Sequence, residues 1–302
     1  MSASISRCGA MGAGRYAPSP SSALHLGNLR TAVVAWLVAR TTDRRFLLRI
    51  DDLDRDRSRT EVAHQQIADL TDLGLDFDPP LVWQSERDDA YSDALGQLDT
   101  YECFCSRREI ADAVRAPHLP VDAYPGTCAE LTEPERVVRR AERPAALRVR
   151  AAGDTMTVTD RWTGEVTGNV DDFVVRRNDG TFAYNLAVVV DDACAGVDQV
   201  IRGADLLGSA PRQAWLAEQL SHPIPSYGHV PLVTGVDGRR LAKRDGAVTL
   251  ADLASAGEDT AAVLGRIAVS LDLATPGEPV TLDHLRARFD PSVAPRPWVV
   301  EG

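Results

Sequence analysis

Long apolar segments are missing from this sequence. A helix that spans a bilayer needs about 20 consecutive apolar residues, and the longest apolar run here, residues 32–38, is closed by Arg40. Residues 1–14 contain a single arginine and no extended apolar core, which is typical of a disordered tail and not of a secretory signal. We therefore expect no membrane partner. Met11 is an alternative start to Met1.

An excess of positive charge is also missing. Lys and Arg number 33 against 44 Asp and Glu, so the net charge is −11. Overall charge therefore does not predict a nucleic-acid-binding protein, although a local basic face is compatible with RNA. An odd number of cysteines without a secretory signal indicates a reducing, cytoplasmic setting. The cysteines are Cys8, Cys103, Cys105, Cys128 and Cys194.

What is present is an alternation of strands and helices, in a chain of 302 residues that is long enough for one large α/β domain or two smaller units. Residues 28–40 and 59–73 carry apolar side chains at helical spacing, with Asn28 in the position of an N-cap. Strands are predicted at residues 15–17 and 45–50. This alternation predicts a parallel sheet with helical crossovers.

The second half of the chain resumes this pattern after an interruption. Residues 103–144 are rich in Pro, Arg and Glu and poor in strand signals, which indicates an insertion. The elements expected beyond it are strands at 147–150, 155–159 and 172–177, turns at Gly164 and 178–180, an apolar stretch at 182–190, a helix at 206–220 and short helical pieces after residue 244.

Residues 24–28 (Leu-His-Leu-Gly-Asn) stand where a strand passes into a helix. Gly27 lets a nucleotide approach the backbone, and the helix N-terminus offers N–H groups to a phosphate. His25 is placed to donate a hydrogen bond to an oxygen that gains charge during phosphoryl or nucleotidyl transfer. Taken alone, the segment is equally consistent with a Gly- and Ser-rich loop that contains an incidental histidine.

Residues 240–246 (Arg-Leu-Ala-Lys-Arg-Asp-Gly) form a second candidate element. Lys243 in a polar loop is able to neutralise a triphosphate as charge develops. Basic turns are common, however, so this segment alone favours a solvated turn.

Together the two segments resemble the paired "HIGH" and "KMSKS" elements of class I aminoacyl-tRNA synthetases. Further segments narrow the resemblance to the glutamyl/glutaminyl branch: 15–20 (RYAPSP), 49–54 (RIDDLD), 184–192 (YNLAVVVDD) and 201–205 (IRGAD). With 25–28 (HLGN) and 241–244 (LAKR) they stand in the family's order. Several such motifs in that order are hard to obtain by chance.

The resemblance implies an α/β, Rossmann-like catalytic domain with a zinc-binding insertion and a short helical C-terminal region. The implied parts are a tail (1–14), the two halves of the catalytic domain (15–100 and 146–249), the insertion (101–145) and the C-terminal region (250–302).

The resemblance also assigns site residues. Glutamate would be held by Arg15, Tyr16, Ala17, Pro18, Ser19, Asp51, Tyr184 and Arg202. ATP, bound with Mg²⁺, would contact His25, Gly27, Asn28 and Lys243, and the catalytic residues would be His25, Asn28 and Lys243. The guanidinium of Arg202 suits bidentate carboxylate recognition. The family usually carries Glu at position 51, and the side chain of Asp51 is shorter. The substrate ammonium must therefore shift toward Asp51, be bridged to it by water, or be bound with the help of Asp52.

Three cysteines of the predicted insertion point to a metal. Cys103 and Cys105 are spaced so that both sulfurs reach one ion, and Cys128 supplies a third. Three thiolates with one more donor form a closed tetrahedral zinc site. Ligand chemistry alone favours His118 as the fourth ligand, the resemblance favours Tyr124, and water is a third option. Clustering in a segment poor in core residues argues against three unrelated thiols, so we expect one structural zinc.

About 50 residues follow the KMSKS-like loop, too few for an anticodon-binding domain. A core of this kind, with its C-x-C…Y-x-x-x-C insertion, resembles the glutamyl-Q tRNA(Asp) synthetases. The resemblance implies a cytoplasmic, monomeric ligase that activates L-glutamate with ATP and transfers it to the queuosine base of tRNA(Asp). Two alternatives stay open: a compact glutamyl-tRNA synthetase that charges tRNA(Glu), and a non-catalytic paralogue that binds tRNA or an amino acid.

Overall fold

A seven-stranded sheet, in the order β3-β2-β1-β9-β10-β6-β7, forms the centre of the computed structural model. The structure describes residues 11–106, 108–110, 124–151, 153–236, 238 and 248–300. Neighbouring strands are parallel from β3 to β6, and β7 runs antiparallel to β6. The strands are β1 (Ala13–Tyr16), β2 (Arg45–Ile50), β3 (Asp78–Trp83), β6 (Asp154–Asp160), β7 (Gly164–Val170), β9 (Val197–Gly203) and β10 (Ser226–Val230).

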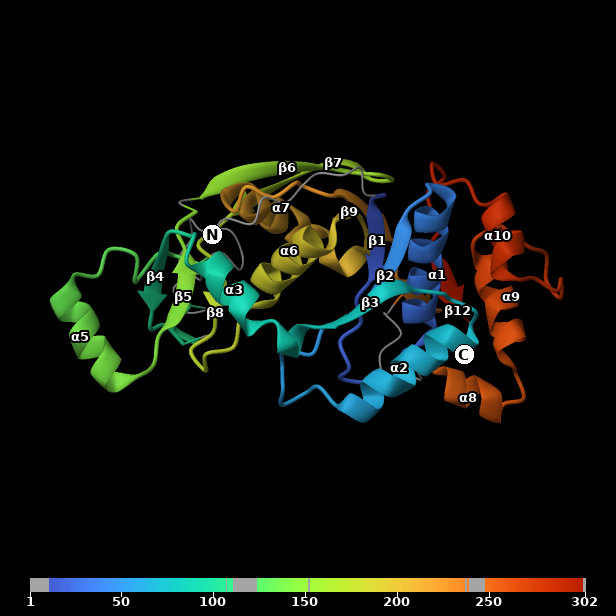
Figure 1. Ribbon diagram of the computed structural model, residues 1–302, viewed down its shortest axis with the longest axis horizontal. Coiled ribbons are helices and arrows are strands. Elements are labelled where there is room, and N and C mark those ends of the chain that lie inside the picture. Colours follow the sequence, from blue (N-terminus) through green and yellow to red (C-terminus); the bar gives the residue numbers. More distant parts are fainter. Residues whose placement is uncertain are drawn as a thin grey trace.

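Helices cover both faces of this sheet, with α6 and α7 on one side and α1 on the other, and α9 and α10 lie beyond α1 (Figure 1). Strand β2 shows why: Phe46 and Leu48 pack into the cluster around α1, whereas Leu47 packs on the opposite face. The helices are α1 (Leu26–Thr41), α2 (Thr60–Asp72), α3 (Asp88–Leu95), α5 (Glu133–Glu142), α6 (Tyr184–Ala195), α7 (Ala210–Gln219), α8 (Leu250–Ser255), α9 (Thr260–Ser270) and α10 (Leu282–Arg288), with 3₁₀ turns at Gln84–Glu86 and Ala204–Ser209. In the ranges described, none of them is both long and apolar enough to cross a membrane.

A smaller antiparallel sheet, in the order β4-β5-β8, lies toward one end of the long axis, beside α5 (Figure 1). Its strands are β4 (Thr100–Cys103), β5 (Ala146–Val149) and β8 (Val174–Arg176). Because β4 and β5 pair directly, they bring together the two ends of the predicted insertion. The helices α8 to α10 lie at the other end of the molecule, near a two-stranded sheet of β11 (Val233–Gly235) and β12 (Trp298–Val300) (Figure 1).

The predicted α/β class is confirmed, with differences at particular elements. Strand β1 begins at Ala13, so residues 13 and 14 belong to the sheet and not to the tail. The N-cap of α1 is His25 and not Asn28, which is the third residue of the helix. The apolar stretch at 182–190 enters α6. The strands that were not predicted are β3, β4, β7, β9, β10, β11 and β12.

The order of strands creates a switch point beside β1. The chain passes from β1 to β2 and β3 on one side, and β9 and β10 extend the sheet on the other. In open α/β sheets, ligands bind outside the carboxyl ends of the strands at such a point. The carboxyl end of β1 leads into residues 17–25, which is where the sequence places its first motif.

Candidate active site

A cavity of about 370 Å³ lies at this switch point. Its walls come from the loop after β1, the start of α1, the first residue of α6 and the end of β9. Residues predicted for glutamate and for ATP therefore share one cavity. The predicted residues that line it are Arg15, Tyr16, Ala17, Pro18, Ser19, His25, Gly27, Asn28, Tyr184 and Arg202.

His25 caps α1, and this capping determines which ring nitrogen of His25 carries the proton. The backbone N–H of Asn28 donates to His25 Nδ1 over 3.2 Å, and the backbone N–H of His25 donates to Asn28 Oδ1 over 3.2 Å. This is a reciprocal capping box with histidine in the place of serine or threonine. Because Nδ1 accepts, a neutral imidazole carries its proton on Nε2. His25 is therefore a hydrogen-bond donor at the helix N-terminus.

Gly27 is required by the packing around this histidine. A Cβ atom at Gly27 would lie 3.0 Å from Cε1 of His25 and 3.4 Å from Cγ2 of Val233. A side chain at this position would press on the ring of His25. The glycine thus leaves room for the imidazole.

Lys243 lies outside the described residues, as does His118. Of the described chain, one residue before the Lys243 segment and one residue after it make contacts near the start of α1. Val233 lines the cavity, and the backbone carbonyl of Val248 accepts a hydrogen bond from the N–H of Leu26 over 3.1 Å.

Arg15 belongs to a buried network of charges under the cavity. Its Nε and Nη2 donate to Oδ1 and Oδ2 of Asp192, over 3.2 and 3.1 Å. Arg49 Nη1 donates to the same Oδ1 over 2.6 Å. Burial acts to raise the pKa of Asp192, but the two guanidinium groups outweigh it and the pKa is lowered. The sequence motif contained Asp192, yet gave it no role, because its partners are distant in the chain.

Arg202 is the second buried guanidinium of the cavity, and it is 4% exposed. Its Nη1 donates to Gln213 Oε1 over 2.7 Å, and its Nη2 donates to the carbonyl of Leu206 over 3.2 Å. Burial lowers its pKa, but an arginine still carries its charge at neutral pH. Tyr184, which is 39% exposed, stands at the mouth of the same cavity.

A second cavity, of about 720 Å³, adjoins the first. Ser19 and Tyr184 line both. Its other walls come from the small sheet and from residues 103–106, so it lies between the central sheet and the region of the cysteines. The two cavities therefore meet at Ser19 and Tyr184.

Asp51 lines the second cavity and not the first. Its Oδ1 accepts a hydrogen bond from Arg49 Nε over 2.6 Å. Burial raises its pKa, and the neighbouring Arg49 offsets this only in part. Asp52 does not join it, since its two oxygens accept from the backbone N–H and the hydroxyl of Ser85, over 2.8 and 2.6 Å.

Gln66 is a residue of this region that sequence reasoning missed. It is 1% exposed and lies on α2, from which its Nε2 donates to the carbonyls of Ser19 and Ser22, over 3.1 and 2.7 Å. It therefore holds the loop that forms one wall of the first cavity. Its position among the polar residues of an amphipathic helix gave no signal of this contact.

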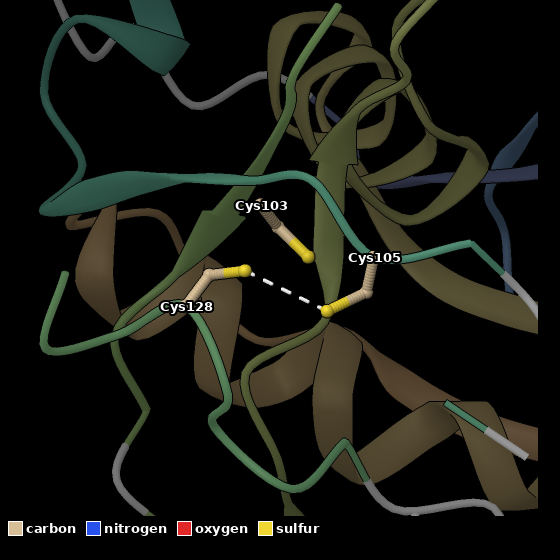
Figure 2. Close-up of side chains that lie close together, drawn as sticks. All are labelled: Cys103, Cys105 and Cys128. Atoms are coloured by element: carbon tan, nitrogen blue, oxygen red, sulfur yellow. Dashed lines mark hydrogen bonds between the residues drawn. The ribbon is translucent and has the colours of Figure 1, made fainter. Parts of the chain in front are cut away.

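The predicted metal ligands come together around a common centre. The Sγ atoms of Cys103, Cys105 and Cys128 point toward one another (Figure 2) and all lie within 4.8 Å. The sulfurs of Cys105 and Cys128 are 3.6 Å apart, and the hydroxyl of Tyr124 lies 3.3 and 3.7 Å from Cys103 and Cys105. A tetrahedral zinc with Zn–S bonds of about 2.3 Å would set its sulfurs about 3.8 Å apart. The cluster therefore fits one zinc ion.

Tyr124 is held in place independently of any metal. Its hydroxyl accepts a hydrogen bond from the backbone N–H of Cys128 over 3.0 Å, and the guanidinium of Arg148 lies 3.6 Å from the centre of its ring. Among the described residues, it is the oxygen donor that accompanies the three sulfurs.

Residues 13–269 match the family described as tRNA synthetases class I (E and Q), catalytic domain. Two solved structures share the fold at 24% identity: glutamate tRNA ligase of Elizabethkingia meningosepticum (TM-score 0.79; 96% of this chain, 67% of that one) and glutamate-tRNA synthetase of Elizabethkingia anophelis (TM-score 0.81; 96% and 68%). At this identity the likeness concerns the fold.

Relatives of higher identity carry one name, glutamyl-Q tRNA(Asp) synthetase. The protein of Nocardia farcinica is 56% identical over 96% of this chain and 93% of its own length. Those of Cutibacterium acnes and Symbiobacterium thermophilum are 53% and 47% identical, over 88% and 94% of this chain and 78% and 94% of theirs. The chain belongs to the glutamyl-Q tRNA(Asp) synthetase family of class I tRNA synthetases.

Proposed function

We propose that this protein activates L-glutamate with ATP and transfers it to the queuosine base of tRNA(Asp). The observation that carries the first step is the convergence of two buried guanidinium groups, Arg15 and Arg202, on a cavity that also contains the capped N-terminus of α1. Such a cavity recognises a carboxylate and a phosphate side by side. The names of the relatives supply the acceptor.

Within this proposal, Arg15, Tyr184 and Arg202 hold the carboxylate end of glutamate, together with the chain from Tyr16 to Ser19. Asp51 receives the ammonium group. Its pKa, raised by burial, returns toward the ordinary range when a cation arrives. Because Asp51 opens on the second cavity, the ammonium lies toward Ser19 and Tyr184, where the two cavities adjoin.

His25, Gly27, Asn28 and Lys243 bind ATP, which class I synthetases use with Mg²⁺. An oxygen of the glutamate α-carboxylate attacks the α-phosphorus, the bond to the β-phosphate oxygen breaks, and pyrophosphate leaves. The Nε2 proton of His25 and the ammonium of Lys243 stabilise the charge that develops on the phosphate oxygens. The protein contributes chiefly position and electrostatics.

The second cavity is the proposed entrance for the acceptor. A queuosine hydroxyl attacks the carbonyl carbon of the adenylate, the bond to the phosphate breaks, AMP leaves, and the hydroxyl proton passes to solvent or phosphate. Arg143 and Arg177 line this cavity and are paired there with the carboxylates of Glu109 and Asp179, over 2.9 and 2.8 Å. Both guanidinium groups are partly exposed, so they are able to exchange a carboxylate for a phosphate of the RNA.

One zinc ion, held by Cys103, Cys105, Cys128 and Tyr124, has a structural role in this proposal. Two of the ligands come from the end of β4 and the residues after it, and the other two come from the middle of the segment between β4 and β5. The ion would therefore tie distant parts of residues 101–145 into one unit beside the catalytic halves 15–100 and 146–249. The C-terminal region is 250–302. We further propose that the protein acts as a monomer in the cytoplasm.

The experiment that tests this function is transfer of labelled glutamate to separated tRNAs. Queuosine-containing tRNA(Asp), queuosine-lacking tRNA(Asp) and tRNA(Glu) are compared at equal concentration. Label on the first alone supports the proposal. Label on tRNA(Glu) would make the protein a compact glutamyl-tRNA synthetase, and absence of glutamate-dependent pyrophosphate exchange would make it a non-catalytic paralogue.

A further inference from the structure

Behind Arg202 lies a series of buried, hydrogen-bonded side chains that reaches across three neighbouring strands. His229 stands opposite Arg202 on β10, and its Nε2 accepts a hydrogen bond from Arg202 Nε over 3.0 Å. The Nδ1 atom of His229 lies 2.7 Å from Oδ2 of Asp160, the last residue of β6. His229 and Asp160 are 4% and 1% exposed, and neither lines the cavity that Arg202 lines.

The direction of each hydrogen bond in this chain is determined. An arginine only donates, so Nε2 of His229 accepts and Nδ1 carries the proton toward Asp160. Oδ1 of Asp160 accepts from the backbone N–H groups of Trp162 and Thr163, over 3.1 and 2.9 Å. Burial lowers the pKa of His229, which keeps the ring neutral as this arrangement requires.

The chain has a consequence for the guanidinium. His229, Gln213 and the carbonyl of Leu206 engage Nε, Nη1 and Nη2 in turn. Of the five N–H groups of an arginine, one on each Nη is left over from these three bonds. The plane of Arg202 is thereby fixed before any substrate arrives, which lowers the entropy lost on binding a carboxylate.

We propose that Asp160 and His229 are positioning residues, which set the orientation and the donor pattern with which Arg202 binds the carboxylate of glutamate. This inference rests on the role proposed above for Arg202. It adds two residues that no part of the sequence motifs contains.

Asp160→Asn tests the donor pattern without changing the size of the side chain. The amide oxygen stays with the two backbone N–H groups, so the NH₂ group faces His229 Nδ1 and the ring proton moves to Nε2, against Arg202 Nε–H. In glutamate-dependent pyrophosphate exchange, we expect KM for glutamate to rise roughly ten- to hundredfold. KM for ATP should change by less than about twofold, because Arg202 is proposed to bind glutamate and not ATP.

His229 variants provide the matched control. His229→Leu removes the acceptor and should raise KM for glutamate as Asp160→Asn does. His229→Gln places an amide oxygen near the position of Nε2 and should recover most of the affinity. A merely structural role would lower stability and raise both KM values, without this rescue. Unchanged KM for glutamate in Asp160→Asn, or an equal rise in KM for ATP, would overturn the proposal.

The ¹⁵N spectrum of the His229 imidazole separates this inference from the proposed function. The wild-type ring should be protonated at Nδ1, and the Asp160→Asn ring at Nε2. A wild-type proton on Nε2 overturns the positioning chain whatever the substrate is. Absence of glutamate-dependent exchange with a ring protonated at Nδ1 overturns the proposed function alone.

Discussion

Arg15 and Asp192 lie face to face, joined by hydrogen bonds of 3.2 and 3.1 Å between Nε and Oδ1 and between Nη2 and Oδ2. They come from β1 and α6, 177 positions apart in the chain. A third bond, of 2.6 Å, links Asp192 to Arg49. One carboxylate therefore orients both the arginine proposed to bind glutamate and the arginine that contacts Asp51.

Asp192→Asn should therefore be strongly destabilising. It leaves Arg15 and Arg49 buried next to each other with one negative charge fewer, and breaking a buried ion pair from one side costs about 3–5 kcal/mol. Urea denaturation measures the free energy of unfolding. The control is Asp198→Asn, which breaks the more exposed pair with Arg44 and should cost about 1 kcal/mol or less. Equal losses in the two variants would refute the network as a source of stability.

The cysteine cluster predicts a zinc content of one per chain. Cys105→Ser should reduce the bound zinc and lower the melting temperature, because a structural site stabilises the fold around it. Cys194→Ser is the matched control, since Cys194 is exposed and lies on α6 outside the cluster. Elemental analysis of purified protein is the measurement. Wild-type protein free of zinc after purification without chelators would exclude the zinc site.

A structural feature is predictable from the sequence when the interactions that form it join residues close together in the chain. Strand β2 and helix α2 were predicted within a residue or two because apolar spacing is a local signal. Strand β7 (GEVTGNV) was not predicted because its two glycines and its exposed side chains are typical of a loop. Only its pairing with β6 makes it a strand.

The same distinction holds for the site. Histidine is a rare N-cap, so the sequence assigned the cap of α1 to Asn28, although the box uses both residues. The residues carried by motifs, such as Arg15 and Arg202, do meet at one cavity. Those that support them from behind, Asp192 and His229, have partners 27 to 177 positions away, and no local pattern encodes such pairs.

Lys243→Ala should separate chemistry from binding. If Lys243 stabilises charge that develops only as pyrophosphate leaves, its loss lowers the rate of activation by a factor of roughly 100 or more and changes KM for glutamate little. Glutamate-dependent pyrophosphate exchange gives both values, and Arg239→Ala, outside the LAKR segment, serves as the control. An unchanged rate would remove Lys243 from the mechanism.

The buried histidines predict how stability depends on pH. Burial lowers the pKa of His229 and of His222, so both rings take up a proton less readily in the folded protein than in the unfolded chain. The groups that face His229 are the carboxylate of Asp160, the guanidinium of Arg202 and the ring of Tyr227, stacked at 6.2 Å. A protonated His229 would place a second positive charge against Arg202.

The sign of the pH dependence follows from the protons taken up on unfolding. Below the ordinary histidine pKa of about 6.5, the unfolded chain binds protons that the folded protein does not, so the free energy of unfolding falls as the pH is lowered. The fall from His229 ends once the pH drops below its folded pKa. Urea denaturation at pH 7.5, 6.5 and 5.5, values chosen to span this range, should show a smaller slope in His229→Gln and also in His222→Gln. A slope in His229→Gln equal to that of the wild type would show that this ring is charged in the folded protein, and the neutral donor pattern derived for it would be wrong.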